Sequence, residues 1–360
     1  MTPDDLLTDP PAPGLYRTHP VANLTAVAGA IRDAYLGEGP ITLGPARRLV
    51  VLAVDVLGYR AAADTLTPAW GTALTSEFPS TTVACMLTAV TGRRASDHGL
   101  IGVHQLHPDG LGAVNCFDGV RDEPTGAAPA RPTRTPDLPT VFTEVDAPTV
   151  ALPNELATLH ADVVGRLFAG CDTVAPPGTA IEAAVAATPT GLIWCYFDLD
   201  THAHRHGLDA AYRQAVGELN VLASRLSAAG TAVALFSDHG LALHRPTTPT
   251  LSAFAAAAEE CRLPPGGAGR VRWLYPHRAR ADRIAARLAE RIPDAYVVDP
   301  DTLAAWGMVK AGSIGQHRMG EIVLVAHGPD VPGPDSSATY EHGSMTAEEI
   351  LIPFMTWPGG

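Results

Sequence analysis

The chain has 360 residues, of which 46% are hydrophobic, so it has ample material for a buried core and no compositional sign of disorder. Acidic residues number 38 against 25 lysines and arginines, which gives a formal net charge of -13 at pH 7. This charge repels phosphate backbones and anionic lipid headgroups, and it argues against nucleic acid polymers and membranes as partners. An anionic substrate would need bound cations to attract it.

The cysteines and the N-terminal segment indicate the cellular compartment. The five cysteines are widely spaced and odd in number, and none lies in a C-x-x-C motif, so reduced thiols are expected. The segment MTPDDLLTDPPAPGLYR carries acids and prolines where a secretion signal would have a basic end and an apolar run. No stretch approaches about 18 uninterrupted apolar residues. We therefore expect a soluble, cytoplasmic protein.

Short apolar segments rich in β-branched residues alternate along the chain with amphipathic segments. The former predict buried parallel strands at residues 49–54, 192–197, 232–236, 295–298 and 322–326. The latter predict helices at residues 23–35, 84–91, 152–168, 210–229 and 280–291. This alternation predicts an α/β fold with a mainly parallel sheet.

The domain organisation is expected to be simple. We expect a single catalytic domain over residues 1–360, with a smaller inserted subdomain within about 241–320 whose first part, up to residue 300, holds a helix and two strands. Proline-rich stretches at residues 2–20, 123–140 and 327–337 are predicted to be surface loops without a core of their own.

Carboxylates follow three of the predicted strands at the point where each strand ends. Asp55 follows the first strand, Asp198 and Asp200 follow the second, and Asp238 with His239 follows the third. Ligands of open α/β sheets collect at this carboxyl edge. One aspartate after a strand is usually a turn former or a helix N-cap, but three such positions predict a shared site.

Histidines accompany two of these carboxylates. Asp200 and His204 are four residues apart, which places them on one face of a helical turn and lets both reach a single ion. His202 and His206 are rivals within the same cluster, and a solvated histidine-rich helix start is the alternative. Asp238 and His239 can share an ion only from a sharp turn, which Gly240 permits.

The residue types predict the metal. Aspartate and histidine together favour zinc or another transition ion over magnesium, which prefers oxygen ligands. Three aspartates and three histidines, with His342 near the C-terminus as the third, are enough for two ions. Two ions about 3.5–4 Å apart form a clamp for in-line displacement at phosphorus.

A candidate nucleophile lies at the junction of a loop and a predicted helix. The segment at residues 77–82 ends in the hydroxyl residues Ser80, Thr81 and Thr82. A helix N-terminus stabilises an alkoxide and the anionic phosphate that it attacks. Simple helix capping is the alternative.

These segments together resemble the nucleotide pyrophosphatase/phosphodiesterase family of the alkaline phosphatase superfamily, particularly its compact actinobacterial members. The matching pieces span residues 49–355 and run in the family's order: VVLAVDVLGYR, TSEFPSTTVACMLTAVTGRRASDHGLIGV, YFDLDTHAHRHG, LFSDHG, RMGEIVLVAHG and EHGSMTAEEILIPFM. The resemblance implies an alkaline-phosphatase-like three-layer sandwich, in which helices flank a mostly parallel central sheet, plus a small insertion.

The resemblance also implies roles for the candidate residues. The first ion would be held by Asp55, Asp238, His239 and the nucleophile Thr82, and the second by Asp200, His204 and His342. Thr82 is preferred to Ser80 and Thr81 because the family's nucleophile stands nine residues before the threonine of a Thr-Gly pair, here Thr91. The cofactors would be two divalent ions, zinc first, with manganese or another transition ion as alternatives. His98 matches a position that is expected to be structural, and the context of His342 fits the family better than that of His327.

One position departs from the family. Many relatives carry an asparagine that donates to a phosphate oxygen where this chain has Cys85. Loss of such a donor costs about 2.7–4 kcal/mol in other enzymes. We therefore consider both Cys85 and Asn115, the latter as a substitute donor, as substrate-binding candidates.

The implied activity is hydrolysis of phosphodiester or pyrophosphate bonds through a phosphothreonine intermediate on Thr82. The substrate would be a small phosphate ester or a nucleotide-like molecule, and no oligomeric state is predicted. Alternatives are a phosphomonoesterase or phosphonate hydrolase, for which Arg93, Arg94 or Arg318 would supply cationic contacts. A catalytically inactive metal-binding homologue is the remaining alternative.

Overall fold

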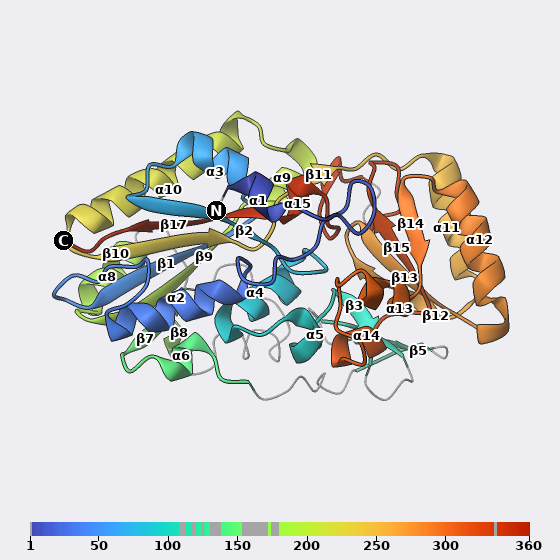
Figure 1. The fold of residues 1–360 in the computed structure, drawn as a ribbon, viewed down its shortest axis with the longest axis horizontal. Coiled ribbons are helices and arrows are strands. Elements are labelled where there is room, and N and C mark those ends of the chain that lie inside the picture. Colours follow the sequence, from blue (N-terminus) through green and yellow to red (C-terminus); the bar gives the residue numbers. More distant parts are fainter. Residues whose placement is uncertain are drawn as a thin grey trace.

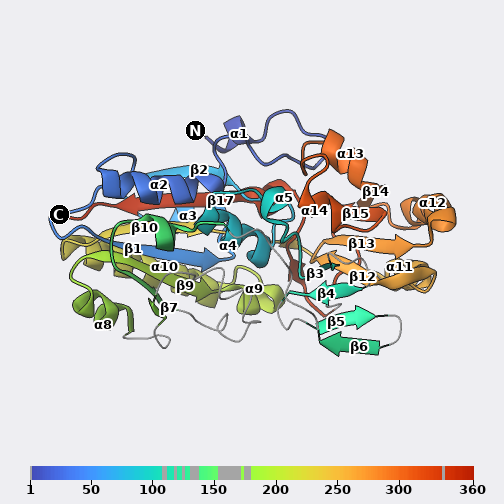
Figure 2. The same ribbon diagram turned by 90° about the horizontal axis from the view of Figure 1, so that it is seen from below.

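The computed structural model describes residues 2–107, 112–116, 120–123, 126–129, 138–152, 172–173, 180–334 and 337–360. The two larger of the three described sheets lie side by side along the long axis of the molecule (Figures 1 and 2). One is the seven-stranded central sheet, and the other has eight strands. Where the chain is described, none of its helices has both the length and the apolar character needed to span a membrane.

The central sheet is mostly parallel, as predicted. Its order is β2-β17-β10-β1-β9-β7-β8. The strands are β1 (Arg48–Asp55), β2 (Trp70–Thr75), β7 (Thr149–Leu152), β8 (Asp172–Thr173), β9 (Gly191–Asp198), β10 (Ala232–Ser237) and β17 (Leu351–Trp357). Only β17 runs against its neighbours, β10 and β2; the other pairings are parallel. The predicted strands at residues 49–54, 192–197 and 232–236 therefore form the middle of this sheet.

Helices cover both faces of the central sheet, which makes the three-layer sandwich expected from the sequence. On one face, α2 (Thr25–Leu36), α4 (Thr82–Thr91) and α6 (Val141–Glu144) pack on Leu49, Val51 and Ala53. On the other, α3 (Tyr59–Thr65), α8 (Ala180–Ala187) and α10 (Ala210–Ala228) pack on Val50, Leu52 and Val54. Because β1 is buried on both faces, its sequence is a continuous apolar run rather than an alternating one.

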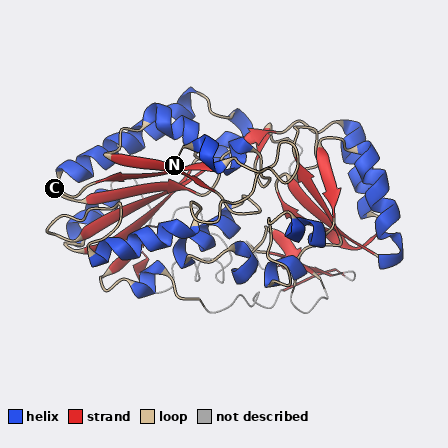
Figure 3. Cartoon of the chain, viewed as in Figure 1, coloured by secondary structure: helices blue, strands red, loops and turns tan. Residues whose placement is uncertain are grey.

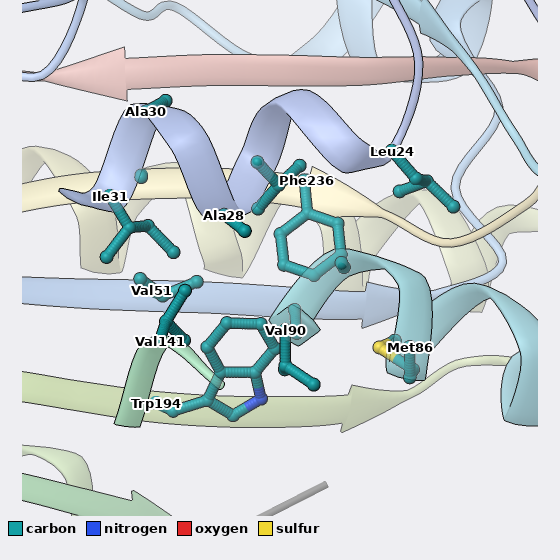
Figure 4. Packing of buried hydrophobic residues seen from close by; sticks show 14 of the residues in the cluster. Leu24, Ala28, Ala30, Ile31, Val51, Met86, Val90, Val141, Trp194 and Phe236 are labelled. Atoms are coloured by element: carbon teal, nitrogen blue, oxygen red, sulfur yellow. The ribbon is translucent and has the colours of Figure 1, made fainter. Parts of the chain in front are cut away.

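Aromatic side chains fill the layer between the sheet and α2 and α4 (Figure 4). Trp194 from β9 and Phe236 from β10 have ring centroids 5.4 Å apart. In Figure 4, Phe236 lies beside Ala28 of α2, and Trp194 lies below it, next to Val90 of α4. Aromatic rings bury large areas in such contacts, so this layer is a main source of the sheet's stability.

The second sheet is antiparallel, in the order β14-β15-β13-β12-β3-β4-β5-β6. Its strands are β3 (His104–Leu106), β4 (Ala113–Asn115), β5 (Val120–Glu123), β6 (Gly126–Pro129), β12 (Cys261–Ala268), β13 (Val271–Pro276), β14 (Ala295–Val298) and β15 (Ile322–Ala326). The strands predicted at 295–298 and 322–326 exist, but they pair with each other antiparallel here rather than in the parallel sheet. Strand β15 is fully buried and β14 is partly buried, and apolar residues fill buried strands in either kind of sheet.

Residues 241–300 have more secondary structure than the predicted helix and two strands. Besides β12, β13 and β14, they contain β11 (Ala242–Leu243), α11 (Thr248–Ala258) and α12 (Ala281–Arg291), and α13 (Pro300–Ala305) and α14 (Ile314–His317) follow them. Side chains from α11 and α12 bury one face of the second sheet, and these helices flank it in Figure 3. The sheet also takes β3 to β6 from residues 104–129. The boundaries of an inserted subdomain stay a prediction.

Four of the five predicted helices lie within the described residues, and all four are confirmed. Those at 23–35, 84–91, 210–229 and 280–291 correspond to α2, α4, α10 and α12. The helix predicted at 152–168 and most of the loop predicted at 123–140 lie outside the described residues.

The N-terminal segment differs from the surface loop that was predicted. It holds a short helix, α1 (Pro3–Leu6), and Leu15 is fully buried in a core cluster. The backbone N–H of Tyr16 donates to the Met345 carbonyl at 2.9 Å. Prolines within this stretch prevent regular structure but do not prevent burial of the apolar residues between them.

The core can be tested at Leu52, which lies in the middle of β1 and is 0% exposed. Leu52→Ala should lower the free energy of unfolding by about 2–5 kcal/mol, because it removes buried methyl groups and leaves a cavity. The same substitution at Leu36, which is 75% exposed at the end of α2, should change it by less than about 0.5 kcal/mol. Urea unfolding of both variants would check this, and equal losses would contradict the described core.

Candidate active site

The structure brings six of the seven predicted metal ligands together in two groups, each of which has its ligand atoms within 4.8 Å of one another. We call Asp55, Asp238 and His239 the inner trio, since all three are buried, and Asp200, His204 and His342 the outer trio. Asp55, Asp238 and His239 lie at the carboxyl ends of β1 and β10, Asp200 and His204 lie on the helix that follows β9, and His342 follows β16 (Tyr340–Glu341). His239 and His342 link the trios, with stacked rings 3.9 Å apart.

The inner trio is formed by two neighbouring parallel strands. Asp55 ends β1 and Asp238 follows β10, one position beyond the pairing of Val54 with Ser237. The backbone N–H groups of Val56 and His239 donate to Asp238 Oδ1 at 3.3 and 2.9 Å. Asp238 Oδ2 is buried without a hydrogen-bond partner and lies 3.4 Å from His239 Nε2.

The outer trio is formed by one helical turn and the loop that contains His342. Asp200 begins α9 (Asp200–His206), and His204 lies one turn later, with its Nε2 3.0 Å from Asp200 Oδ2. His342 Nε2 lies 3.8 Å from Asp200 Oδ1. Asp200 Oδ1 is also buried and has no hydrogen-bond partner.

All three histidines present the same nitrogen to the carboxylates. Each Nδ1 faces a backbone carbonyl, at 3.1 Å for His239 and Gly240, 2.8 Å for His204 and Tyr340, and 2.8 Å for His342 and Ser80. A carbonyl only accepts, so Nδ1 carries the proton and donates it. With Nδ1 protonated, the neutral form of each ring has its lone pair on Nε2, facing the trios, which is the tautomer that binds a metal ion.

The electrostatics of the inner trio also fit a cation. Burial, with the Asp200 charge nearby, raises the pKa of Asp238 to about 8. Burial and the charges of Asp238 and Asp200 raise the pKa of Asp55 well above its usual range. A dication beside the two carboxylates would reverse both effects. Each trio also has one orphaned carboxylate oxygen, so the donor set fits two transition ions.

Thr82 lies beside the inner trio as the first residue of α4. Its Oγ1 is 3.2 Å from Asp55 Oδ2 and 3.3 Å from His239 Nε2. No side chain caps the N-terminus of α4, which leaves its first N–H groups for an anion. Ser80, in contrast, donates its hydroxyl to the Ser344 carbonyl at 2.6 Å and accepts from the Gly343 N–H at 3.0 Å.

The rival histidines have other contacts. His202 Nε2 lies 3.0 Å from Asp209 Oδ1, and His202 does not belong to the outer trio. His98 is fully buried, and its Nε2 is 3.1 Å from Thr88 Oγ1, which agrees with a structural role. The ring of His327 contacts Tyr296, with centroids 4.6 Å apart.

Of the two substrate-binding candidates, Cys85 lies on helix α4 and Asn115 lies in the second sheet. The side chain of Cys85 is fully buried in the core, with its Sγ 3.2 Å from Ser76 Oγ, and burial raises the pKa of its thiol. Asn115 ends β4, opposite His104 in the second sheet. A substrate contact by either residue stays a prediction.

Sequence reasoning missed two polar residues of the site. The Tyr196 hydroxyl donates to Asp55 Oδ2. Glu341 Oε1 lies 3.6 Å from His342 Nε2 and 3.7 Å from His204 Nδ1. Tyr196 stands within an apolar strand and nothing in the sequence separates it from the core, whereas the position of Glu341 directly before His342 was an available signal.

Comparison with known proteins shows the fold. No family model matches the chain, and no curated protein matches it in sequence. Murine ectonucleotide pyrophosphatase/phosphodiesterase 5 has a TM-score of 0.61 at 15% identity, covering 86% of this chain and 88% of that chain. An inactive threonine-to-alanine variant of the same protein, in complex with AMP, has a TM-score of 0.62 at 15% identity, covering 87% and 88%.

A second kind of solved structure is also similar. Phosphonoacetate hydrolase from Sinorhizobium meliloti 1021, in complex with phosphonoformate, has a TM-score of 0.57 at 16% identity, covering 88% of this chain and 93% of that chain. These proteins belong to the alkaline phosphatase superfamily. The narrower resemblance to actinobacterial members stays a prediction. The chain therefore has the alkaline-phosphatase-like fold.

Proposed function

We propose that this protein is a metal-dependent phosphohydrolase that cleaves phosphodiester or pyrophosphate bonds in small, nucleotide-like substrates, with Thr82 as the nucleophile. The observation that carries the proposal is the place of Thr82 Oγ1, between the Asp55 carboxylate and His239 Nε2 at the N-terminus of α4. The inactive threonine-to-alanine variant of the murine protein, solved with AMP, supports both the threonine and the nucleotide-like substrate.

The trios would hold two divalent ions. The inner trio and Thr82 would hold one, and the outer trio the other, with zinc proposed because aspartate and histidine supply the ligands. When bound, such ions lower the pKa of an attacking hydroxyl and stabilise charge on the leaving oxygen.

The residues of the chain itself orient the reaction. Asp55 accepts a hydrogen bond from the Thr82 hydroxyl, which orients Oγ1. The N–H groups at the start of α4 would bind the phosphoryl oxygens of the substrate. Attack by Oγ1 forms the phosphothreonine bond and breaks the bond to the leaving oxygen. Water then attacks the same phosphorus and frees Thr82, so two inversions give net retention.

Phosphomonoester or phosphonate hydrolysis is the second candidate, favoured by the similarity to phosphonoacetate hydrolase. A monoester carries a second charge that usually calls for an arginine. Arg94 is ion-paired with Glu77, and Arg318 donates to the Gly99 carbonyl, so both guanidinium groups are engaged within the fold. The engagement of these two of the three candidate arginines favours the diester over the monoester.

The test is a comparison of kcat/KM for bis(4-nitrophenyl) phosphate, 4-nitrophenyl phosphate and phosphonoacetate with zinc-loaded protein. We expect the diester to be preferred by at least about tenfold, or about 1.4 kcal/mol of transition-state stabilisation. Preference for the monoester or for phosphonoacetate would replace the first candidate with the second. No turnover of any of them by protein that holds two ions would support the inactive homologue.

A further inference from the structure

We propose that Glu341 is a positioning residue that fixes the two imidazoles of the outer trio and strengthens the binding of its ion. The inference deepens the proposed function and rests on it. Nothing in the pattern of the six ligands requires a carboxylate at this position, so the argument comes from the surroundings of Glu341 alone.

The Glu341 carboxylate lies close to the imidazole rings of both His204 and His342. It ends β16, pairs with Ala242 of β11 (Ala242–Leu243), and its side chain is 4% exposed. Its Oε1 accepts from the His342 N–H at 3.1 Å and lies 3.6 Å from His342 Nε2. The same oxygen lies 3.7 Å from His204 Nδ1. One buried oxygen therefore contacts both histidines of the outer trio.

The hydrogen bonds from the two rings to backbone carbonyls do not by themselves fix the orientation of the rings. Each Nδ1–H donates to one carbonyl, which sets the tautomer but still lets the ring turn about that hydrogen bond. An oxygen against the edges of both rings opposes that rotation. Orienting partners of this kind typically change metal affinity 10–100-fold in other proteins.

Backbone on the far side keeps Glu341 in place. Gly269 has a φ of +51°, and a Cβ there would lie 2.8 Å from Glu341 Oε1 and 2.0 Å from the His342 carbonyl oxygen. The chain at Gly269 therefore presses closely against both residues, and only glycine fits there. The Arg270 N–H also donates to the His342 carbonyl at 2.6 Å. The backbone at Gly269 and Arg270 therefore packs against the segment that carries Glu341 and His342.

If Glu341 is not counted, the two trios have different numbers of negatively charged side chains. The inner trio has two carboxylates, Asp55 and Asp238, whereas the outer trio has only Asp200. Glu341 supplies a second negative charge beside the outer trio. Each dication would then lie near two carboxylates, which balances its charge at a buried position.

A purely structural role for Glu341 makes a different prediction. Arg272 of β13 is 8% exposed; burial lowers its pKa to about 10, and the charge of Glu341 opposes that effect. If Glu341 served only to neutralise Arg272, its loss would destabilise the fold and leave metal affinity unchanged. The two roles therefore separate when zinc affinity is measured on folded protein.

The experiment measures zinc stoichiometry and affinity by competition with a chromophoric chelator, and the melting temperature of the metal-free protein. Glu341→Gln should still bind two ions, with the affinity for one of them about 10–100-fold weaker. Glu341→Asp keeps the negative charge but, being one methylene shorter, holds it further from the rings. It should show a smaller loss of zinc affinity, and it carries the test if the glutamine variant does not fold. Glu348→Gln, at an exposed position on α15 (Ala347–Ile350), is the control and should match the wild type.

Asp200→Asn separates this inference from the proposed function, because it removes a ligand of the outer trio and should leave one tightly bound ion. If Asp200→Asn loses an ion while both Glu341 variants keep wild-type affinities, the inference about Glu341 is wrong and the proposed function stands. A wild-type protein that holds fewer than two ions, or an Asp200→Asn protein that keeps both, would overturn the proposed function and this inference with it.

Discussion

Thr82→Ala should lose roughly 10⁴–10⁶-fold of its turnover, the scale of loss when other hydrolases lose their nucleophile. The substitution removes the Oγ1 that contacts Asp55 and His239 but leaves the whole inner trio in place. We therefore expect the variant to retain two zinc ions. Steady-state kinetics with the aryl diester, together with metal analysis of the same sample, would check both expectations.

Thr81→Ala is the matched control, since it is the same substitution one residue earlier in the chain. Thr81 is the N-cap residue of α4, and its side chain makes no capping hydrogen bond, so turnover should stay within a few fold of the wild type. A Thr82→Ala protein that binds two ions and keeps full turnover would exclude Thr82 as the nucleophile. Loss of turnover in Thr81→Ala alone would move the role to Thr81.

Removal of the ions by a chelator should abolish turnover, with a loss of about 10³-fold or more that added zinc reverses. It should also make stability depend on pH. At pH 6.5, Asp55, Asp238 and His204 carry protons in the folded metal-free protein. Burial raises the pKa of both carboxyl groups, that of Asp238 to about 8, and the hydrogen bond with Asp200 and the charge of Glu341 outweigh burial and raise the pKa of His204 to about 10.

The sign of the pH effect follows from the unfolded chain. There the carboxyl groups are ionised above pH 4 and histidine is mostly neutral above pH 6.5, so the folded state binds more protons. The free energy of unfolding of the metal-free protein should therefore fall as the pH rises from 6.5 to 8, lowering Tm by about 2–6 °C. Zinc replaces these protons, so the loaded protein should show little change. Thermal scans of the metal-free and the zinc-loaded protein at both pH values would measure this. An equal change of Tm with pH in the two forms would contradict the assignment of these protons to the buried site.

The central sheet is predictable from the sequence because its middle strands are buried on both faces. Residues 49–54, 192–197 and 232–236 are continuous apolar runs, and two of the helices that cover them, α2 and α10, have 12 and 19 residues and bury one side only. The second sheet is harder to predict. Its β3 has only three residues, and β12 contains Pro264 and Pro265 and pairs with β13 through register shifts. Prolines and glycines of this kind indicate a loop unless the bulges are known.

The candidate site is predictable where it follows strand ends. Asp55, Asp200 and Asp238 each come just after a recognisable strand, and parallel strands bring such residues to one edge. His342 is different, because it reaches the site from a distant segment through the contacts of Ser80 with Gly343 and Ser344. Those contacts have no periodic signal, so His342 was placed only by resemblance.

The position of β17 has a consequence for the order in which the protein assembles during synthesis. This strand lies between β2 and β10, yet residues 351–357 follow every other strand in the chain. Until they leave the ribosome, β2 has no partner in the central sheet, and the exposed edge of β10 is open to other chains. The parallel strands β1, β9 and β10 can associate before that point, so the edge of the sheet that carries Asp55 and Asp238 can form while its far side still awaits the last strand.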